Sequence, residues 1–168
     1  DRQDNSGDLG LGYRNGTLSD DLLGYWRMDR NVIGSGGIVK DYSGYGFNGT
    51  AENNLNTGRE GILSTNSSKF EPSAGSQVRV DDMDLTTSDS DDVFTVSAWI
   101  NTDDTEDYDG ILTFSEYTGV FLCADGGFSI QSNGGNAGTC PSMSPINDGE
   151  WHHVIGTFIE GERYLGYR

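Results

Sequence analysis

The stretch GEWHHVIGTF, residues 149–158, decides how the chain is interpreted, because it holds the only two histidines, His152 and His153. On a β-strand, successive side chains point to opposite faces, so adjacent histidines cannot share one metal ion. No cysteine or histidine elsewhere completes a recognisable zinc-binding spacing. We therefore predict a structural strand here rather than a catalytic or metal-binding pair. Its two faces carry, in turn, Trp151, His153, Ile155 and Thr157, and His152, Val154, Gly156 and Phe158.

The segment VFTVSAWIN, residues 93–101, alternates in the same way. Its apolar face carries Phe94, Val96, Ala98 and Ile100, and its other face carries Thr95, Ser97 and Trp99. A period of two residues is typical of a half-buried strand, and no segment shows a helical period of 3.6. Further strands are expected at 22–28, 38–40, 76–80, 110–115, 119–125 and 127–132. Because glycine turns separate these segments, we predict an all-β fold, an antiparallel β-sandwich.

The length of 168 residues is typical of about one domain. Residues 1–20 lack periodicity and are interpreted as a polar linker or lead-in. Residues 21–168 are expected to form the β-sandwich domain.

The net charge of −17 excludes nucleic acid and anionic membranes as partners, since both attract a basic surface. Lys40 and Lys69 are the only lysines. An acidic, hydrated surface is typical of a protein from a high-salt habitat, where salt screens self-repulsion. The alternative is that some carboxylates bind calcium, which prefers oxygen ligands. No apolar run reaches transmembrane length.

Two cysteines, Cys123 and Cys140, enclose 16 residues. We predict that they form a disulfide, which contributes about 3 kcal/mol in the chain-entropy model; buried free thiols are the alternative. Glycosylation sequons occur at Asn15, Asn48 and Asn66. Together these features favour an extracellular location.

Four segments in order give the chain a family resemblance: LLGYWRMD (22–29), DYSGYGFNGT (41–50), FTVSAWINT (94–102) and DGEWHHVIGTF (148–158). They resemble the LamG-like jelly-roll domains of the concanavalin A-like lectin/glucanase superfamily. The resemblance covers about residues 21–160 and implies a jelly roll of two curved antiparallel sheets. Members usually continue through several more strands, whereas this sequence stops at GERYLGYR (161–168). The sequence leaves three explanations open: a shortened chain, strands supplied by another chain, or a role for the first 20 residues as a strand.

The resemblance implies a structural calcium site at the glycine-rich segment 41–50. Its ligands would be Asp41, main-chain carbonyls near Ser43 and Gly44, and the side chain of Asn48. A carboxylate with carbonyls from a glycine turn supplies oxygens that calcium accepts. The alternative is an Asx turn, in which Asp41 accepts a hydrogen bond from a nearby N–H.

The run TDDTEDYDG, residues 102–110, places five acids between Asp103 and Asp109. It follows the Trp99 strand and is interpreted as a solvated hairpin loop, with calcium binding as the alternative. It lacks the glycine and closing glutamate of an EF-hand.

Carbohydrate binding requires aromatic platforms and hydrogen-bonding groups on a concave face or in end loops. Trp99 shares its strand face with two hydroxyl residues, although the family often buries a tryptophan at this place. The other candidates for stacking on sugar are Tyr42, Tyr45, Tyr108 and Tyr117.

These observations predict a non-catalytic extracellular recognition domain, on the surface of a halophilic organism, that binds glycan or a surface glycoprotein in adhesion. No glucanase-type E-x-D-x-x-E carboxylate pair is present, so we expect no enzyme activity. The alternative function is a structural subunit or headpiece of a surface filament, pilus or viral fibre that self-associates and takes strands from a neighbour.

Overall fold

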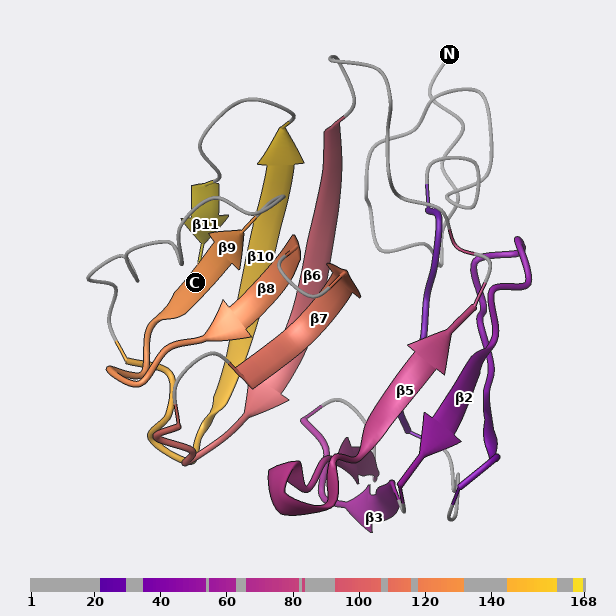
Figure 1. Ribbon diagram of the computed structural model, residues 1–168, viewed down its shortest axis with the longest axis horizontal. Helices are drawn as coiled ribbons and strands as arrows, with labels where there is room; N and C mark the ends of the chain where they lie inside the picture. The colour runs from indigo at the N-terminus through magenta and orange to yellow at the C-terminus, as the bar shows by residue number, and fades with distance from the viewer. Residues whose placement is uncertain are drawn as a thin grey trace. The chain divides into compact units, whose positions relative to one another are not determined.

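The computed structural model describes residues 22–29, 35–53, 55–62, 66–81, 83, 93–106, 109–115, 118–131, 145–159 and 165–167. These residues form β-strands that pair antiparallel throughout, with no α-helix and with one 3₁₀ turn, η2, at Pro72–Ala74. The predicted all-β, antiparallel fold is therefore confirmed. Tertiary contacts divide the chain into two units, unit 1 at 1–83 and unit 2 at 84–168 (Figure 1).

The part of unit 1 that the structure describes contains two small sheets. The first has the order β1-β2-β5 and the second pairs β3 with β4. Their bounds are Ile38–Val39 for β1, Gly49–Glu52 for β2, Asn56–Arg59 for β3, Ser67–Lys69 for β4 and Gln77–Val80 for β5. The buried members of the small core of unit 1 are Val39, Ala51 and Leu55.

Residues 22–28 do not form the strand that their apolar pattern predicts. They make one isolated bridge, between Trp26 and Asp41. Met28 has a φ of 55°, in the left-handed region that side chains other than glycine seldom adopt. An extended strand cannot continue through such a residue, so the segment ends there.

The described residues of unit 2 form two three-stranded sheets that pack face to face (Figure 1). One has the order β11-β10-β6 and the other the order β7-β8-β9. The bounds are Val93–Asn101 for β6, Asp109–Ser115 for β7, Thr118–Leu122 for β8, Phe128–Gln131 for β9, Trp151–Ile159 for β10 and Leu165–Tyr167 for β11. The strands expected at 93–101, 110–115, 119–125, 127–132 and 151–159 are present within these bounds.

The core of unit 2 lies between its two sheets. Buried side chains from β8, β9 and β10 meet Ile146, which is 0% exposed. The inward face of β6 packs against them with Phe94, Val96, Ala98 and Ile100, as the alternation predicts. On β10, His152, Val154 and Gly156 are buried while His153, Ile155 and Thr157 are only partly so. The two histidines therefore point to opposite faces of the sheet, as expected.

The acidic run 102–110 is not a hairpin loop, contrary to the sequence interpretation. Strand β6 pairs with β10 over its whole length, and β7 pairs with β8. The run therefore connects the two sheets of unit 2 rather than two neighbouring strands. A hairpin was expected because the run follows the Trp99 strand directly in the sequence. In the structure, that strand, β6, pairs instead with β10, which lies much further along the chain.

Cys123 follows β8, is fully buried, and is one half of a disulfide. Its only possible partner within the chain, Cys140, lies outside the described residues. The pairing of the two cysteines stays a prediction.

If Cys123 and Cys140 are joined, reduction will lower the free energy of unfolding by about 3 kcal/mol, because the unfolded chain regains loop entropy. Urea denaturation followed by tryptophan fluorescence, with and without dithiothreitol, measures this change. A variant with both cysteines replaced by serine is the control and should not respond to the reductant. Alkylation of either thiol in unreduced, unfolded protein would contradict the pairing.

Candidate functional site

The outward face of β6 and β10 is the candidate site. We call it the Trp99 face and define it as Thr95, Ser97, Trp99 and Asn101 of β6 with Trp151, His153, Ile155 and Thr157 of β10. The register of the two strands places Trp99 opposite His153 and Asn101 opposite Trp151. The opposite side of the same strands faces the core, so the surface rests on a packed support.

Trp99 and His153 form the centre of this face. Their rings stack with centroids 4.9 Å apart and planes inclined by 23°. The Trp99 residue remains 42% exposed. It is therefore a surface residue, and the family's buried tryptophan does not describe it. The stack fixes the indole ring while leaving it accessible to a ligand.

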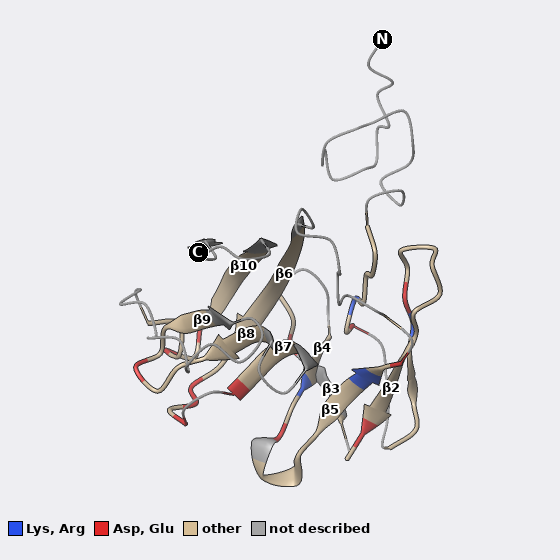
Figure 2. Ribbon diagram, turned by 45° about the horizontal axis from the view of Figure 1, so that its top comes forward, with Lys and Arg blue, Asp and Glu red and all other residues tan. Residues whose placement is uncertain are grey.

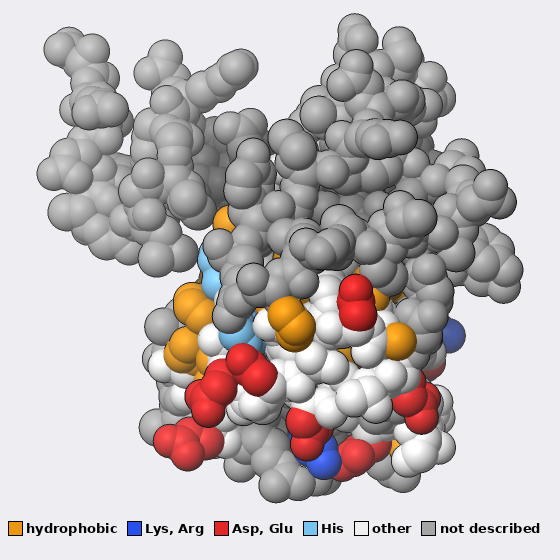
Figure 3. Space-filling model, turned by 90° about the vertical axis from the view of Figure 1, so that its left-hand side faces the viewer, with side chains coloured by type: hydrophobic (Ala, Val, Ile, Leu, Met, Phe, Trp, Pro, Cys, Tyr) orange, Lys and Arg blue, Asp and Glu red, His pale blue; other side chains and the backbone are white. Residues whose placement is uncertain are grey.

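Polar groups surround the stacked rings. The Nε2 atom of His153 lies 2.7 Å from the Ser97 hydroxyl, and the hydroxyls of Thr95 and Thr157 lie 3.0 Å apart. Asn101 donates from Nδ2 to the Gly149 carbonyl at 2.6 Å. In the space-filling view, histidine and hydrophobic side chains lie together on the surface, with acidic side chains beside them (Figure 3).

His153 is the residue of this face that sequence reasoning missed as a binding candidate. Its strand face could be assigned from the alternation of residues 151–158. Its place beside Trp99 depends on the β6–β10 register, which joins residues more than 50 positions apart. The available signal in the sequence was that Trp99 and His153 each share a strand face with a threonine, Thr95 and Thr157.

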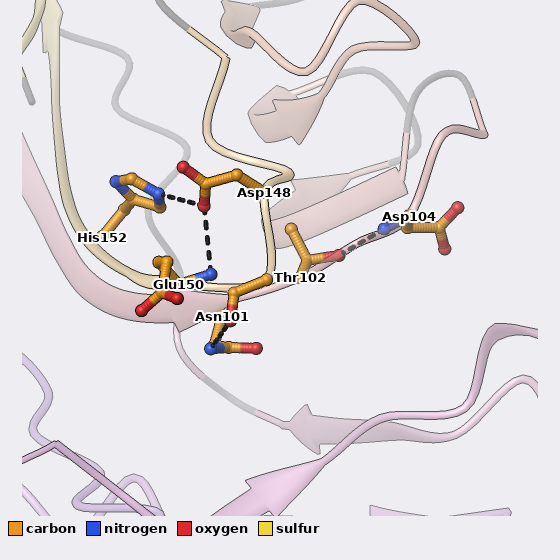
Figure 4. Close-up of polar contacts among 7 residues, drawn as sticks. Asn101, Thr102, Asp104, Asp148, Glu150 and His152 are labelled. Carbon is orange, nitrogen blue, oxygen red and sulfur yellow. Dashed lines mark hydrogen bonds and ion pairs between the residues drawn. The ribbon is translucent and has the colours of Figure 1, made fainter.

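His152 lies on the core side and has a different environment. It is 8% exposed, and its Nε2 atom lies 2.8 Å from Oδ1 of Asp148 (Figure 4). The same Oδ1 accepts the Glu150 N–H at 3.0 Å. The hydrogen bond with His152, followed by that from Glu150, holds the pKa of Asp148 below its usual range. The pair therefore anchors the turn that leads into β10.

The acidic connection between β6 and β7 is built from turns that side chains cap. Thr102 Oγ1 accepts the Asp104 N–H at 3.1 Å, and Asp104 Oδ1 accepts the Glu106 N–H at 2.8 Å. Acidic residues gather in the loops of unit 2 (Figure 2). Among the described residues, no group of three or more histidine, cysteine, aspartate or glutamate side chains is arranged to hold a metal ion.

Asp109, at the start of β7, is a carboxyl group of this connection whose ionised form is disfavoured. Burial raises its pKa above the ordinary value, and the adjacent carboxylates of Asp104 and Glu106 raise it further. Among the described residues, its buried Oδ2 has no hydrogen-bond partner. Because the folded state binds this proton more tightly, Asp109 contributes stability at acid pH that is lost as pH rises through the raised pKa.

Asp41, the predicted calcium ligand, is 5% exposed and is surrounded by hydrogen-bond donors. Its Oδ1 accepts the N–H groups of Tyr25 at 2.9 Å and Ser43 at 2.8 Å. Its Oδ2 accepts the Ser43 hydroxyl at 2.6 Å and the N–H groups of Gly46 at 3.1 Å and Phe47 at 3.0 Å. The turn requires glycine, since Gly44 and Gly46 have φ of 105° and 82°.

These donors do not fit a calcium ion at the Asp41 carboxylate. A carboxylate has about four lone-pair positions, and five N–H or O–H donors already occupy them. The Oδ1 atom of Asn48, another predicted ligand, accepts the Asp41 N–H at 3.0 Å. The geometry favours the alternative interpretation, an Asx-type turn extended to several donors. We therefore expect that Asp41 does not bind calcium, and an experiment below tests the calcium site that the resemblance implies.

The balance of forces on Asp41 determines its response to pH. Burial alone would raise its pKa, but the hydrogen bonds from Ser43, Tyr25 and Phe47 outweigh it and hold the pKa below the ordinary value. A depressed pKa means that the ionised carboxylate stabilises the fold above the ordinary aspartate pKa. That contribution is lost as pH falls through the folded-state pKa.

The other predicted site residues lie apart from the Trp99 face or outside the described residues. Tyr45 is 52% exposed and stacks on Phe47, with centroids 6.2 Å apart. Tyr42 packs edge to face against Tyr25 at 6.3 Å. Tyr108, Tyr117 and the sequon residue Asn15 lie outside the described residues, and the sequon residues Asn48 and Asn66 lie in unit 1.

Residues 72–165 match the family model of laminin G-like domains, described as the concanavalin A-like lectin/glucanases superfamily. Because the match covers more than half of the chain, the protein belongs to this family. The match includes the segments 94–102 and 148–158 and begins after the other two segments that carry the resemblance. No curated protein and no solved structure matches the chain. None of the described residues forms a helix long and apolar enough to cross a membrane.

Replacing Asp41 by asparagine should lower the free energy of unfolding by about 2–4 kcal/mol. The amide keeps the shape but turns an N–H₂ group toward donors that need an acceptor. Urea denaturation with calcium and then with a chelator measures the effect, and the wild-type curve should be the same in both.

The matched control is Asp125→Asn. Asp125 also accepts a hydrogen bond in a turn, but among the described residues from the Gly127 N–H alone, at 2.9 Å, so the loss should stay below about 1 kcal/mol. Stabilisation by calcium in the wild type but not in Asp41→Asn would show that Asp41 binds the metal.

Replacing Asp109 by asparagine should raise the free energy of unfolding at neutral pH by a few tenths to about 1 kcal/mol, because it removes a repelled, partly buried charge that solvent screens in part. The gain should vanish at acid pH, where Asp109 is protonated. The exposed Asp103→Asn variant removes the same charge from the same connection and serves as the control. Equal stabilisation by both variants would assign the effect to net charge instead.

Proposed function

We propose that this protein is a non-catalytic extracellular recognition domain that binds neutral carbohydrate on the Trp99 face. Members of the superfamily to which the chain belongs bind carbohydrate or protein partners. The observation that carries the proposal is the half-exposed Trp99 ring, stacked on His153 and surrounded by hydroxyl groups.

The apolar part of the site is prepared before a ligand arrives. An exposed indole contacts the C–H face of a sugar ring over a large area. Because His153 already restrains the indole at a centroid distance of 4.9 Å, binding costs little side-chain entropy. The strands beneath are held by the core of unit 2, which keeps the platform rigid.

The polar side chains of the Trp99 face would orient a bound sugar through hydrogen bonds. The Ser97 hydroxyl and His153 imidazole form one pair, and the Thr95 and Thr157 hydroxyls form another. Each hydroxyl has a donor and two acceptor positions, so one hydrogen bond within the pair leaves capacity for a sugar hydroxyl. Aromatic area beside hydroxyl groups is a combination that suits carbohydrate better than an apolar ligand.

The charge of the chain supports neutral rather than sulfated or acidic glycans. At a net charge of −17, an anionic ligand meets repulsion on approach. Asn101 lies at one end of the Trp99 face, and its side chain donates a hydrogen bond to the Gly149 carbonyl. Asp148 and Glu150 are the neighbours of Gly149 in the chain, so both acids lie close to that end of the face. We place the domain on the surface of a halophilic organism, where high salt would screen its self-repulsion.

Trp99→Ala should weaken binding of the best neutral glycan by about tenfold or more, since a central aromatic platform carries much of the binding energy. A glycan array at high salt selects the ligand, and isothermal titration calorimetry measures its affinity. Phe70→Ala is the matched control because Phe70 is 43% exposed and lies in unit 1.

Unchanged affinity in Trp99→Ala would remove the Trp99 face as the site. A different outcome would be that no neutral glycan on the array binds and that light scattering detects polymers. That outcome would favour the alternative function of self-association in a surface filament.

A further inference from the structure

Ser97 and His153 share a hydrogen bond at the centre of the Trp99 face, and its length indicates which residue donates. Ser97 Oγ is 2.7 Å from His153 Nε2, and Ser97 is exposed. Hydrogen bonds donated by a hydroxyl group are typically about 2.7–2.8 Å long, whereas those donated by N–H are typically about 2.9–3.0 Å long. The distance therefore favours Ser97 as the donor, which requires a neutral imidazole with its proton on Nδ1.

This direction limits what Ser97 offers to a ligand. A hydroxyl group has one proton and two acceptor positions. While Ser97 donates its proton to His153, only lone pairs of Ser97 Oγ remain for a sugar. Neutral His153 therefore makes Ser97 an acceptor, which suits a neutral saccharide because sugar hydroxyl groups can donate.

Protonation of His153 reverses the hydrogen bond. Imidazolium carries N–H on both nitrogens, so Nε2 becomes the donor and Ser97 Oγ becomes the acceptor. The hydroxyl proton of Ser97 is then free to point toward a ligand. The Trp99 ring accommodates the new charge, because its centroid lies 4.9 Å from that of His153 and an indole face attracts a cation at this distance.

Among the described residues of the Trp99 face, His153 is the side chain that can change charge between about pH 5 and 8. The other outward side chains of β6 and β10 are neutral. The neighbouring strand β11 contains one titratable residue, Tyr167, and tyrosine changes charge only near about pH 10. The acids Asp148 and Glu150 lie at the end of the face, and Asp148 is hydrogen-bonded to His152 on the opposite side of the sheet.

His152 provides an internal reference for the proton on His153. Its Nε2 lies 2.8 Å from Oδ1 of Asp148, and an ionised carboxylate can only accept. Nε2 of His152 therefore carries a proton whether the imidazole is neutral or charged. These two histidines are the only ones in the chain, and their Nε2 atoms are expected to differ in protonation when His153 is neutral.

We propose that His153 is a proton-controlled specificity switch, which shifts the preference of the Trp99 face from neutral hexoses toward hexuronates when it becomes charged. The inference rests on the proposed function, since it concerns the same carbohydrate site. A carboxylate accepts hydrogen bonds but cannot donate them. It finds no donor in a Ser97 hydroxyl that already donates to neutral His153. The reversed pair presents it with a hydroxyl donor beside a positive charge.

The first test is a long-range ¹H–¹⁵N spectrum of the imidazole groups in the ¹⁵N-labelled full chain, without ligand, at about pH 8 and about pH 5. The variant His153→Gln assigns the two sets of signals. We expect a proton on Nδ1 of His153 at the higher pH, protons on both of its nitrogens at the lower pH, and a proton on Nε2 of His152 at both. A proton on Nε2 of neutral His153, or no change in its charge between the two pH values, would overturn the switch.

The second test compares glucuronate with glucose, and galacturonate with galactose, by titrating the full chain at both pH values. The sugars of each pair differ only at C6, so the ratio of their dissociation constants isolates the carboxylate. The ratio should shift by about threefold to fivefold toward the hexuronate at the lower pH, as expected for an exposed ion pair. The shift should disappear in His153→Gln, because glutamine can still hydrogen-bond to Ser97 but cannot take up a proton.

His152→Gln is the matched control, because it removes the other histidine from the opposite face of the sheet. Its ratio should shift as in the wild type, and circular dichroism checks that both variants fold. An equal shift in wild type and His153→Gln would assign the effect to the overall charge and overturn the switch. Binding with an unchanged ratio would overturn the switch alone, whereas no binding of any of the four sugars would overturn the carbohydrate site and the switch together.

Discussion

The pairing of β6 with β10 is the constraint on which unit 2 depends. Nine consecutive residue pairs, from Asn101 with Trp151 to Val93 with Ile159, keep one register without interruption. That register directs Ala98 and Val154 into the core and brings Trp99 and His153 together on the other side. A shift by one residue would exchange the two faces and bury the polar groups. The register of β6 and β10 therefore determines both the packing of unit 2 and the position of the candidate site.

Unit 1 depends on a different interaction, because its strands are short and its core is small. There, the Asp41 carboxylate joins the segment before it, at Tyr25, to the glycine turn after it, at Gly46 and Phe47. Main-chain N–H groups supply the positive partial charges that a bound cation would supply elsewhere. The donors around the Asp41 carboxylate therefore belong to the chain itself.

The sequence predicted those parts of the fold that alternate in polarity. Residues 93–101 and 151–158 showed their inward and outward faces, and both assignments are confirmed for the side chains that the structure describes. Strands β2, β3, β4 and β11 were not predicted, because they are short and polar or rich in glycine. Trp99 was found as a candidate from its polar neighbours, but His153 was not joined to it, since register is a long-range property. The donors around Asp41 were also invisible, because they depend on how the chain returns in space.

The strict alternation of β6 and β10 has a consequence for how this domain can diversify. Positions 95, 97, 99, 153, 155 and 157 lie on the outward face, while the residues between them face the core. The outward set can therefore be exchanged in evolution, or randomised in a laboratory library, without altering a single packed side chain beneath it. A sheet with this pattern is a scaffold on which new specificities can arise by substitution alone, with no change in loop length.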